Sequence, residues 1–384
     1  FAREKWTAGR SDLVGIPSAV TGEPVASTGS GGLDFKLMLE FARNKGGPNL
    51  REMTFHERAY MLKDLALALT ERKDELYALN GFTGATQRDG GVDIEGGIGT
   101  LFSASSKGRR ELPDDKILID GAMEQVSKTG TWMGQHVYTS LKGVAIHINA
   151  FNFPVWGMLE KLGPTLLAGV PAIVKPGTAT AYLTEAAVRI MVESGKLPEG
   201  ALQLIVGSTG DLLDNLTGQD VVSFTGSAVT AFKLRSNPNI VREGTRFIAE
   251  QDSLNACVLA PDATPDTPEF ELFIKEVVRE ITVKAGQKCT AIRRAFVPAA
   301  LIDEAEKALA KALGKITVGD PTLDGVRMGA LVSMDQRNDV RSKIQELQED
   351  AQIVFGNPNE VDVVGGSADD GAFISPVLLR CDNP

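Results

Sequence analysis

Between residues 143 and 250 the sequence alternates short apolar runs with stretches of helical length, and this alternation constrains the fold more than any other feature. The apolar runs, which we expect to be strands, span residues 143–149, 172–175, 202–206, 221–225 and 247–250. The expected helices between them span residues 154–168, 181–194, 210–216 and 227–234. Strands that alternate with helices in this way form βαβ units with parallel strands. The sequence therefore predicts an α/β fold with a mostly parallel sheet.

Polar residues lie at the ends of four of these strands, namely Asn152, Lys175, Ser227 and Glu250. Open α/β sheets bind their ligands at the carboxyl ends of the strands, so we expect these four residues to form a ligand-binding rim. Taken singly, each has an ordinary structural interpretation. Asn152 resembles a turn residue before Phe-Pro, and Glu250 resembles a surface carboxylate.

A second α/β unit follows residue 250, and its clearest helix spans residues 268–284. Thr267 is the expected N-cap, and Pro268 occupies the first helical position, where a missing N–H costs nothing. Cys289 falls in the loop after this helix, close to four basic residues: Lys284, Lys288, Arg293 and Arg294. Positive neighbours favour the thiolate form of a cysteine, although the same charges are also compatible with a solvated surface.

The composition excludes several classes of function. The chain has 384 residues, a formal net charge of −10 and three cysteines. The negative charge argues against binding along a nucleic-acid backbone. So few cysteines, odd in number, do not form a disulfide framework, and they indicate a reducing, cytoplasmic setting. We expect no membrane span and no metal site, and because residue 1 is Phe rather than Met we expect the chain to begin inside a longer protein.

Three local patterns in the first half of the chain predict structure around the sheet. Residues 54–57 fit a capping box, which predicts a helix from Thr54 to about residue 79. Residues 84–101 are compatible with a helix, and their glycines suggest close packing against another backbone. Residues 123–140 predict a β-hairpin around Thr129-Gly130-Thr131. Because exposed strand edges need to be covered, we expect the hairpin to join a homodimer or a multiple of one.

Several motifs occur in one order: N-F-P at 152–154, K-P at 175–176, F-T-G-S at 224–227, Glu250 and G-Q-K-C at 286–289. Each is weak alone, but the ordered set resembles the aldehyde dehydrogenase superfamily over the whole chain. The resemblance implies a Rossmann-like NADP-binding domain at residues 1–122 and 141–250. It also implies an oligomerisation hairpin at 123–140 and a catalytic domain, C-terminally incomplete, at 251–384.

The resemblance also assigns catalytic roles. Cys289 is expected to attack the aldehyde carbonyl and form a thiohemiacetal. Asn152 and the Cys289 backbone N–H are expected to stabilise the developing oxyanion. Glu250 is expected to act as the general base on the water that hydrolyses the thioester. Members that transfer the acyl group to coenzyme A generally lack this glutamate, so its presence favours release of a free acid.

Cofactor binding in the family assigns the remaining residues. Lys175 is expected at the adenosine ribose or its phosphate, and residues Phe224, Thr225, Gly226 and Ser227 near the pyrophosphate, where a helix begins. Ala231 stands where the family often has a second glycine. NAD-preferring relatives commonly have Glu at the position of Thr178, and a threonine does not repel a 2′-phosphate. We therefore expect NADP to be preferred, with NAD remaining an alternative.

Glu250 is followed by Gln251-Asp252-Ser253 instead of the usual Leu-Gly-Gly, which resembles the branch that serves coenzyme A-dependent degradation of aromatic compounds. The resemblance is to the dehydrogenase part of the bifunctional phenylacetate-pathway protein, which oxidises 3-oxo-5,6-dehydrosuberyl-CoA semialdehyde and carries a hydratase-like domain beyond this segment. The alternatives are 3,4-dehydroadipyl-CoA semialdehyde oxidation in benzoate catabolism, an acyl-CoA-forming enzyme, and a truncated nucleotide-binding fragment without turnover. The family's downstream E-x-F-G-P motif is absent from these 384 residues.

Overall fold

The computed structural model describes residues 1–11 and 13–382, and the chain divides into two compact units. The first unit comprises Phe1–Val14, Thr28–Leu76 and Asp93–Gln251. The second comprises Gly15–Ser27, Tyr77–Val92 and Asp252–Pro384. Two segments from the first hundred residues thus belong with the C-terminal unit.

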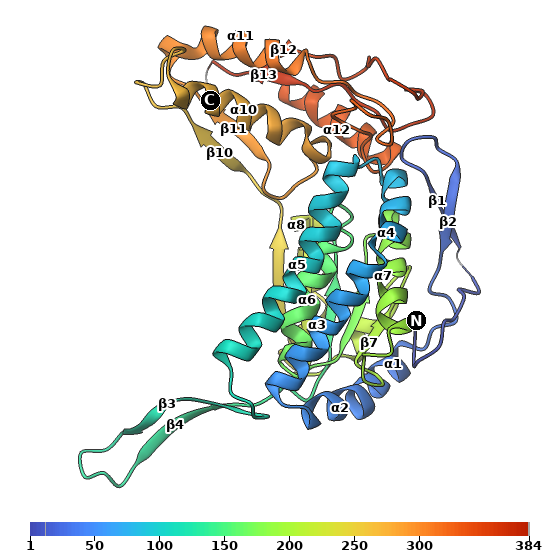
Figure 1. The fold of residues 1–384 in the computed structure, drawn as a ribbon, viewed down its shortest axis with the longest axis vertical. Helices are drawn as coiled ribbons and strands as arrows, with labels where there is room; N and C mark the ends of the chain where they lie inside the picture. Colours follow the sequence, from blue (N-terminus) through green and yellow to red (C-terminus); the bar gives the residue numbers. More distant parts are fainter. Residues whose placement is uncertain (12, 383–384) are drawn as a thin grey trace. The chain divides into compact units, whose positions relative to one another are not determined.

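A five-stranded parallel sheet forms the centre of the first unit (Figure 1). Its strands, in the order β7-β6-β5-β8-β9, are Leu202–Leu204, Ala172–Lys175, Ala145–Ile148, Val221–Gly226 and Arg246–Gln251. All four neighbouring pairs are parallel. The chain builds outwards from β5 to β7 and then returns to add β8 and β9 on the other side. The predicted α/β fold with a parallel sheet is confirmed, and β5 and β8 flank the point where the strand order reverses, where such sheets bind ligands.

Helices after the strands cover this sheet, as the sequence predicts. The helices are α6 (Trp156–Leu167), α7 (Ala181–Glu193) and α8 (Ala228–Arg235). The expected helix at 210–216 is only a short 3₁₀ turn, η4 (Leu212–Asn215). Strands β5, β6 and β7 are buried, and Ile146, Ile173 and Val222 are fully enclosed, whereas the edge strand β9 is largely exposed. Such continuous apolar runs are typical of parallel strands that are covered on both faces.

The predicted capping box at Thr54 is present and begins α3 (Phe55–Glu71). The Thr54 hydroxyl accepts from the Glu57 N–H at 3.2 Å, and the Glu57 carboxylate accepts from the Thr54 N–H at 2.7 Å. The helix ends earlier than predicted, because the chain leaves helical conformation at Arg72 before α4 (Lys73–Asn80) begins. Arg72 there binds the carboxylates of Glu75 and Glu193, which fixes the break between the two helices.

The glycine-rich segment forms α5 (Gln87–Glu111), which is longer than the sequence predicts. Its glycines allow the close packing that we expect from the sequence. A Cβ atom at Gly96 would lie 2.4 Å from the Trp156 ring, and one at Gly97 would lie 2.8 Å from the Trp156 Cα. This tertiary contact with the start of α6 offsets the poor intrinsic helix propensity of glycine.

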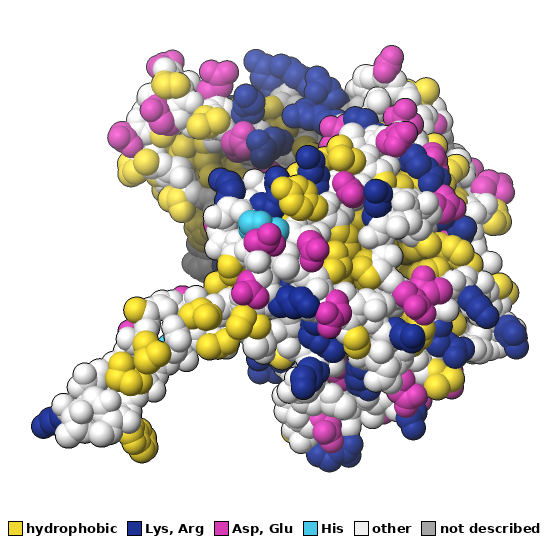
Figure 2. Space-filling model, turned by 60° about the horizontal axis from the view of Figure 1, so that its bottom comes forward, with side chains coloured by type: hydrophobic (Ala, Val, Ile, Leu, Met, Phe, Trp, Pro, Cys, Tyr) yellow, Lys and Arg dark blue, Asp and Glu magenta, His cyan; other side chains and the backbone are white. Residues whose placement is uncertain are grey.

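The predicted hairpin is formed by β3 (Leu118–Gln125) and β4 (Met133–Tyr138), which are antiparallel. Gly130 has a positive φ of 70° in the connecting loop, a conformation that favours glycine. The hairpin extends from the first unit (Figure 1), and hydrophobic side chains are visible along it in the space-filling view (Figure 2). Trp132 and Val126 are 73% and 67% exposed.

The second unit contains three long helices and two small sheets beside the sheet of β1 (Val14–Pro17) and β2 (Pro24–Thr28). Its helices are α10 (Pro268–Thr282), α11 (Ile302–Leu313) and α12 (Met334–Leu347). Strands β10 (Asn255–Val258) and β11 (Ile292–Phe296) are parallel, and β12 (Gln352–Phe355) and β13 (Leu378–Arg380) are antiparallel. Thr267 caps α10 as predicted by accepting from the Phe270 N–H, and the apolar stripe of the helix packs into a core with α11.

The other elements are β1 (Val14–Pro17), β2 (Pro24–Thr28), α1 (Phe35–Phe41), η1 (Ala42–Gly46), α2 (Gly47–Glu52), η2 (Gly81–Thr83), η3 (Thr178–Thr180), α9 (Pro238–Glu243), η5 (Val283–Gly286) and η6 (Ala299–Leu301). No helix in residues 1–11 and 13–382 is long and apolar enough to cross a membrane.

Candidate active site

The sheet register brings the predicted strand-end residues into neighbouring positions. Ile148 at the end of β5 is paired with Lys175 of β6 on one side and with Phe224 of β8 on the other. One residue further along β8, Thr225 is paired with Glu250 of β9. Because all of these strands are parallel, their carboxyl ends meet at the same edge of the sheet. Lys175, Phe224, Thr225 and Glu250 therefore lie along the edge at which such sheets bind ligands.

The loop that carries Asn152 follows β5 and is held by the segment after β6. The Thr180 hydroxyl donates to the Phe151 carbonyl at 2.9 Å, and the Thr184 hydroxyl donates to the Pro154 carbonyl at 2.9 Å. Gly177 approaches the same loop so closely that a Cβ there would lie 2.7 Å from the Phe151 nitrogen. The half-buried Asn152 is thus presented by a loop fixed at several backbone positions, beside the segment that contains Lys175 and Thr178.

Asp93, which is fully buried, holds the start of α6 directly after this loop. Its Oδ1 accepts from the Trp156 N–H at 2.8 Å and from the Val155 N–H at 3.2 Å. A carboxylate at a helix N-terminus satisfies backbone N–H groups that have no partner within the helix, and it also interacts favourably with the helix dipole. Asp93 therefore has a structural role in positioning α6.

Lys161 on α6 contacts the residues at the carboxyl ends of the strands, and the sequence analysis did not predict this role. Its Nζ donates to the Thr225 hydroxyl at 2.7 Å and lies 3.4 Å from the Gly157 carbonyl. Burial lowers the pKa of the Lys161 ammonium, and the carboxylates of Glu160 and Glu250 oppose that shift. Thr225, which we expected at the cofactor, therefore has a contact within the protein.

Glu160 is a second acidic residue near Glu250 that the sequence reasoning missed. Its Oε2 accepts from the indole N–H of Trp156 at 3.0 Å. The residue keeps contact with solvent, but surrounding protein desolvates the carboxyl and raises its pKa. Lys161 and Trp156 oppose this shift, whereas the Glu250 carboxylate adds to it. The helical spacing of α6 gave no signal for this cluster, because Glu160 and Lys161 look like an ordinary polar face.

The residues around Lys175 fit a nucleotide cofactor. Within the part of the chain that the structure describes, the Lys175 ammonium makes no ion pair, and burial lowers its pKa. Asn149, at the end of β5, is 5% exposed, and both polar atoms of its side-chain amide lack a hydrogen-bond partner in the same described residues. Thr178 is exposed at the start of η3. These groups offer a cation, an amide and a hydroxyl to a ribose or a phosphate.

The F-T-G-S segment lies where β8 passes into α8, as predicted. Ser227 is the N-cap of α8, and its Oγ accepts from the Thr230 N–H at 3.3 Å. Phe224 is buried, and a Cβ at Gly226 would lie 2.6 Å from its ring, so that only glycine fits without rearrangement. The exposed N-terminus of α8 suits a pyrophosphate through its dipole and backbone amides, while the Ser227 side chain primarily caps the helix.

Cys289 belongs to the second unit, whereas Asn152, Lys175 and Glu250 belong to the first. The chain leaves α10 at Val283 and then passes through three successive left-handed residues: Lys284, Ala285 and Gly286. Positive φ is costly for the first two of these, which are not glycine. Cys289 follows in a half-buried loop before β11.

The basic residues near Cys289 differ in their surroundings. Lys288 is 8% exposed and forms an ion pair at 2.7 Å with Glu280 of α10, which is also buried. The Arg293 guanidinium donates to the Lys288 carbonyl at 3.1 Å, and its pKa is lowered mainly by burial. Arg294 is exposed and donates to the Leu254 carbonyl. The interpretation as a solvated surface therefore applies to Arg294 but not to Lys288.

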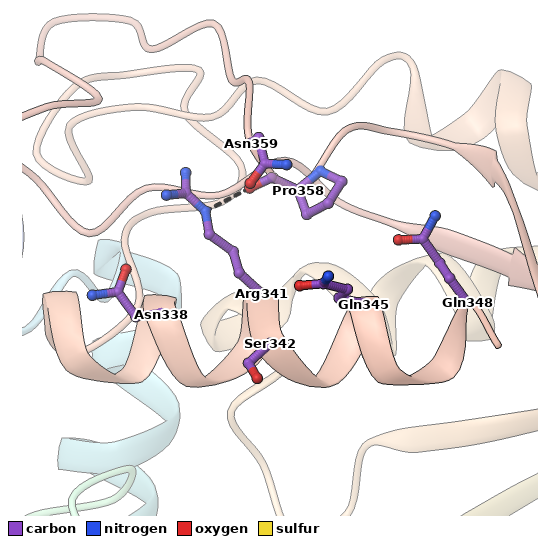
Figure 3. A pocket seen from close by; sticks show the side chains of 7 residues that line it. All are labelled: Asn338, Arg341, Ser342, Gln345, Gln348, Pro358 and Asn359. Carbon is purple, nitrogen blue, oxygen red and sulfur yellow. Dashed lines mark hydrogen bonds between the residues drawn. The ribbon is translucent and has the colours of Figure 1, made fainter.

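A polar hollow of about 520 Å³ lies along α12, and none of the predicted site residues lines it. It is lined by Asn338, Arg341, Ser342, Gln345, Gln348, Pro358 and Asn359. Figure 3 shows Arg341 reaching across it, and the Arg341 Nε donates to the Pro358 carbonyl at 2.7 Å. No group of acidic, histidine and cysteine residues that could hold a metal ion occurs in residues 1–11 and 13–382.

Comparison with known proteins identifies relatives of the whole chain. The model of the aldehyde dehydrogenase family matches residues 6–383. A 3,4-dehydroadipyl-CoA semialdehyde dehydrogenase of Aromatoleum evansii is 42% identical over 98% of this chain and 73% of its own length. A sulfoacetaldehyde dehydrogenase of Neptuniibacter caesariensis is 25% identical over 88% of this chain and 70% of its own length.

The same fold occurs in solved structures. A betaine aldehyde dehydrogenase from Staphylococcus aureus, crystallised in complex with NAD+, superimposes with a TM-score of 0.85 at 22% sequence identity. The match covers 100% of this chain and 73% of that one. At this identity the likeness establishes the fold, and it agrees with the parallel sheet of the first unit.

Proposed function

The chain belongs to the aldehyde dehydrogenase family, and from that membership we propose that it oxidises a coenzyme A-linked semialdehyde of aromatic catabolism to the free acid, with NADP as oxidant. The observation that carries the substrate class is the 42% identity, over nearly the whole chain, to a 3,4-dehydroadipyl-CoA semialdehyde dehydrogenase. This relative favours the benzoate-type substrate, which the sequence reasoning ranked second, over the phenylacetate-type substrate.

In the proposed mechanism the Cys289 thiolate attacks the aldehyde carbonyl and forms a thiohemiacetal. The Asn152 amide and the Cys289 N–H donate hydrogen bonds to the oxygen as negative charge develops on it. When bound, the nicotinamide cofactor accepts a hydride from the substrate carbon. Glu250 then takes a proton from the water that attacks the resulting thioester, and the acid leaves as the thiolate is regenerated.

The residues of the first unit would hold the cofactor. We assign Lys175, Asn149 and Thr178 to the ribose and its 2′-phosphate, and Gly226 and the N-terminus of α8 to the pyrophosphate. Lys175 supports this assignment because it is an unpaired cation within the described part of the chain. We propose the domain roles predicted from the sequence, in which residues 1–122 and 141–250 bind the cofactor and residues 251–384 supply the nucleophile, with the difference that residues 15–27 and 77–92 belong to the second compact unit.

The substrate proposal is tested by comparing kcat/KM for three aldehydes with NADP in excess. The panel is 3,4-dehydroadipyl-CoA semialdehyde, 3-oxo-5,6-dehydrosuberyl-CoA semialdehyde and a short aliphatic aldehyde without coenzyme A. We expect the first to be preferred and the third to be poorest. Equal kcat/KM for the short aldehyde would contradict a coenzyme A-linked substrate, and a clear preference for the second would restore the phenylacetate assignment.

We also propose that the hairpin of β3 and β4 joins two copies of the chain. Its exposed apolar side chains support this, because isolated two-stranded hairpins are marginal in water and benefit from a partner. Light scattering should show a dimer or a multiple of one. Trp132→Ser should shift the protein towards monomer, whereas a monomeric parent protein would contradict the proposal.

A further inference from the structure

Side chains hold three carbonyl oxygens in the loop that carries Cys289. The Asn255 amide nitrogen donates to the Cys289 carbonyl at 2.6 Å and to the Ala291 carbonyl at 3.2 Å. A side-chain amide has two N–H groups, so both donors of Asn255 are used. The Arg293 guanidinium donates to the Lys288 carbonyl at 3.1 Å. The carbonyl groups on both sides of the nucleophile are therefore bound by side chains.

Fixing a carbonyl also fixes the N–H of the next residue. A trans peptide unit is planar, and its C=O and N–H point in opposite directions. The Lys288 carbonyl shares its peptide plane with the Cys289 N–H, so the hydrogen bonds that this carbonyl accepts from Arg293 and from the Ala291 N–H at 3.2 Å together set the direction of that N–H. In the same way, Asn255 sets the plane between Cys289 and Thr290. A rotation of either plane would require one of these hydrogen bonds to break.

The surrounding structure explains why such a device is needed. The preceding turn places Lys284 and Ala285 at φ values of 53° and 51°, which are strained for residues with a side chain. A strained turn relaxes unless other contacts oppose it. The buried ion pair between Lys288 and Glu280 anchors the loop to α10 but acts through a side chain, and it binds neither peptide plane.

Arg293 reaches the loop because the strand that carries it is irregular. In the β10 and β11 pair, Asn255 is opposite Ile292 and Ala256 is opposite Arg294, so that Arg293 is an extra residue. A bulge of this kind redirects a side chain, and bulges are frequent beside active sites. Asn255 begins the partner strand β10, so Asn255 and Arg293 both come from the paired N-terminal ends of β10 and β11.

We propose that Asn255 and Arg293 are positioning residues that fix the peptide planes on either side of Cys289 and so direct the Cys289 N–H towards the substrate oxyanion. The proposal rests on the nucleophilic role of Cys289 proposed above. Arg293 also interacts electrostatically with Cys289, so its effect on the backbone donor is separated from its effect on the thiol by measuring both reactions on the high-pH plateau of the rate, where the thiol is fully ionised.

Two reactions of the same thiol test the proposal in the full chain, without aldehyde or cofactor. With p-nitrophenyl acetate, the thiolate attacks the acetyl carbon, p-nitrophenolate leaves and a thioester forms through an oxyanion. With iodoacetamide, the thiolate displaces iodide and no oxyanion forms. On this plateau we expect Asn255→Leu, a neutral change of similar size, and Arg293→Gln to slow p-nitrophenolate release about 10- to 100-fold, somewhat less than complete loss of an oxyanion donor. Alkylation by iodoacetamide should be unchanged, and Arg293→Lys should recover part of the acylation rate.

Arg294→Gln is the matched control, because this neighbouring guanidinium is exposed and donates to Leu254 instead of the Cys289 loop. It should leave both reactions unchanged. Equal losses of the acylation and alkylation rates in the Asn255 and Arg293 variants would overturn the proposal, as would an unchanged acylation rate. Since the two residues lie on different strands, a folded variant of either one decides the question if the other fails to fold. Persistent p-nitrophenolate release in Cys289→Ala would instead contradict the proposed function.

Discussion

Replacement of Asp93 tests whether the site depends on the capped start of α6. The buried Asp93 carboxylate accepts from two backbone N–H groups, those of Val155 and Trp156, at 3.2 Å and 2.8 Å. Asp93→Ala removes the acceptor and leaves both N–H groups without a hydrogen-bond partner at the buried start of a helix. Asp93→Asn retains one acceptor oxygen but loses the negative charge that favours the helix dipole.

The geometry sets the size of the effect. Each buried N–H without a partner costs about 1–3 kcal/mol, and loss of a helix cap costs about 0.5–2 kcal/mol. Since the two estimates describe the same groups, they are not added, and we expect Asp93→Ala to lower the free energy of unfolding by about 2–4 kcal/mol. Asp93→Asn should cost roughly half as much, because one hydrogen bond can remain.

Urea unfolding followed by circular dichroism measures this difference. Glu95→Ala is the matched control, because Glu95 is a carboxylate on the same helix whose ion pair with Lys73 at 2.8 Å is exposed. That change should cost less than about 1 kcal/mol. The Asp93 variants should also lower kcat, because α6 carries Lys161 to Thr225. Equal free energies of unfolding for Asp93→Ala and Glu95→Ala would show that the Asp93 carboxylate does not stabilise the start of α6.

Three further changes test individual features. Glu280→Gln leaves the buried Lys288 ammonium without its partner at 2.7 Å and should cost about 3–5 kcal/mol in urea unfolding; a loss below 1 kcal/mol would contradict a buried pair. Glu160→Gln removes a carboxyl whose folded-state pKa is raised, so that ionising it destabilises the folded protein. This destabilisation is absent below the ordinary pKa of 4.5 and grows as the pH rises from there to the folded-state pKa. The variant should therefore gain stability relative to the parent between pH 4.5 and neutrality, and a gain confined to lower pH would contradict a raised pKa. Thr178→Glu places a like charge near the 2′-phosphate and should shift the ratio of kcat/KM for NADP and NAD by about tenfold or more towards NAD, whereas an unchanged ratio would exclude Thr178 from cofactor selection.

The sequence was most informative where a local pattern and the tertiary structure agree. Strands β5, β6 and β7 were predictable because parallel strands covered on both faces appear as continuous apolar runs. The cap at Thr54 was predictable because a capping box uses only residues within one helical turn. Lys175 and Glu250 could be placed at strand ends for the same reason, since each ends an apolar run.

Features that depend on contacts between distant residues could not be predicted. Asn255 meets the Cys289 loop only because β10 pairs with β11, and the bulge at Arg293 has no local signal. The length of α5 depends on the packing of its glycines against Trp156, which overrides their low helix propensity. The cluster of Glu160 and Lys161 looked like a solvated helix face, and only the structure shows Lys161 bound to Thr225.

Trapping of the acyl-enzyme shows directly whether Cys289 is the nucleophile and Glu250 the general base. If Cys289 is the nucleophile and Glu250 activates the hydrolytic water, Glu250→Gln should accumulate a thioester when it is mixed with NADP and 3,4-dehydroadipyl-CoA semialdehyde. Peptide mass mapping should then find the acyl group on Cys289, together with one equivalent of NADPH and little free acid. The absence of an adduct, or an adduct on Cys257 or Cys381, would contradict the account.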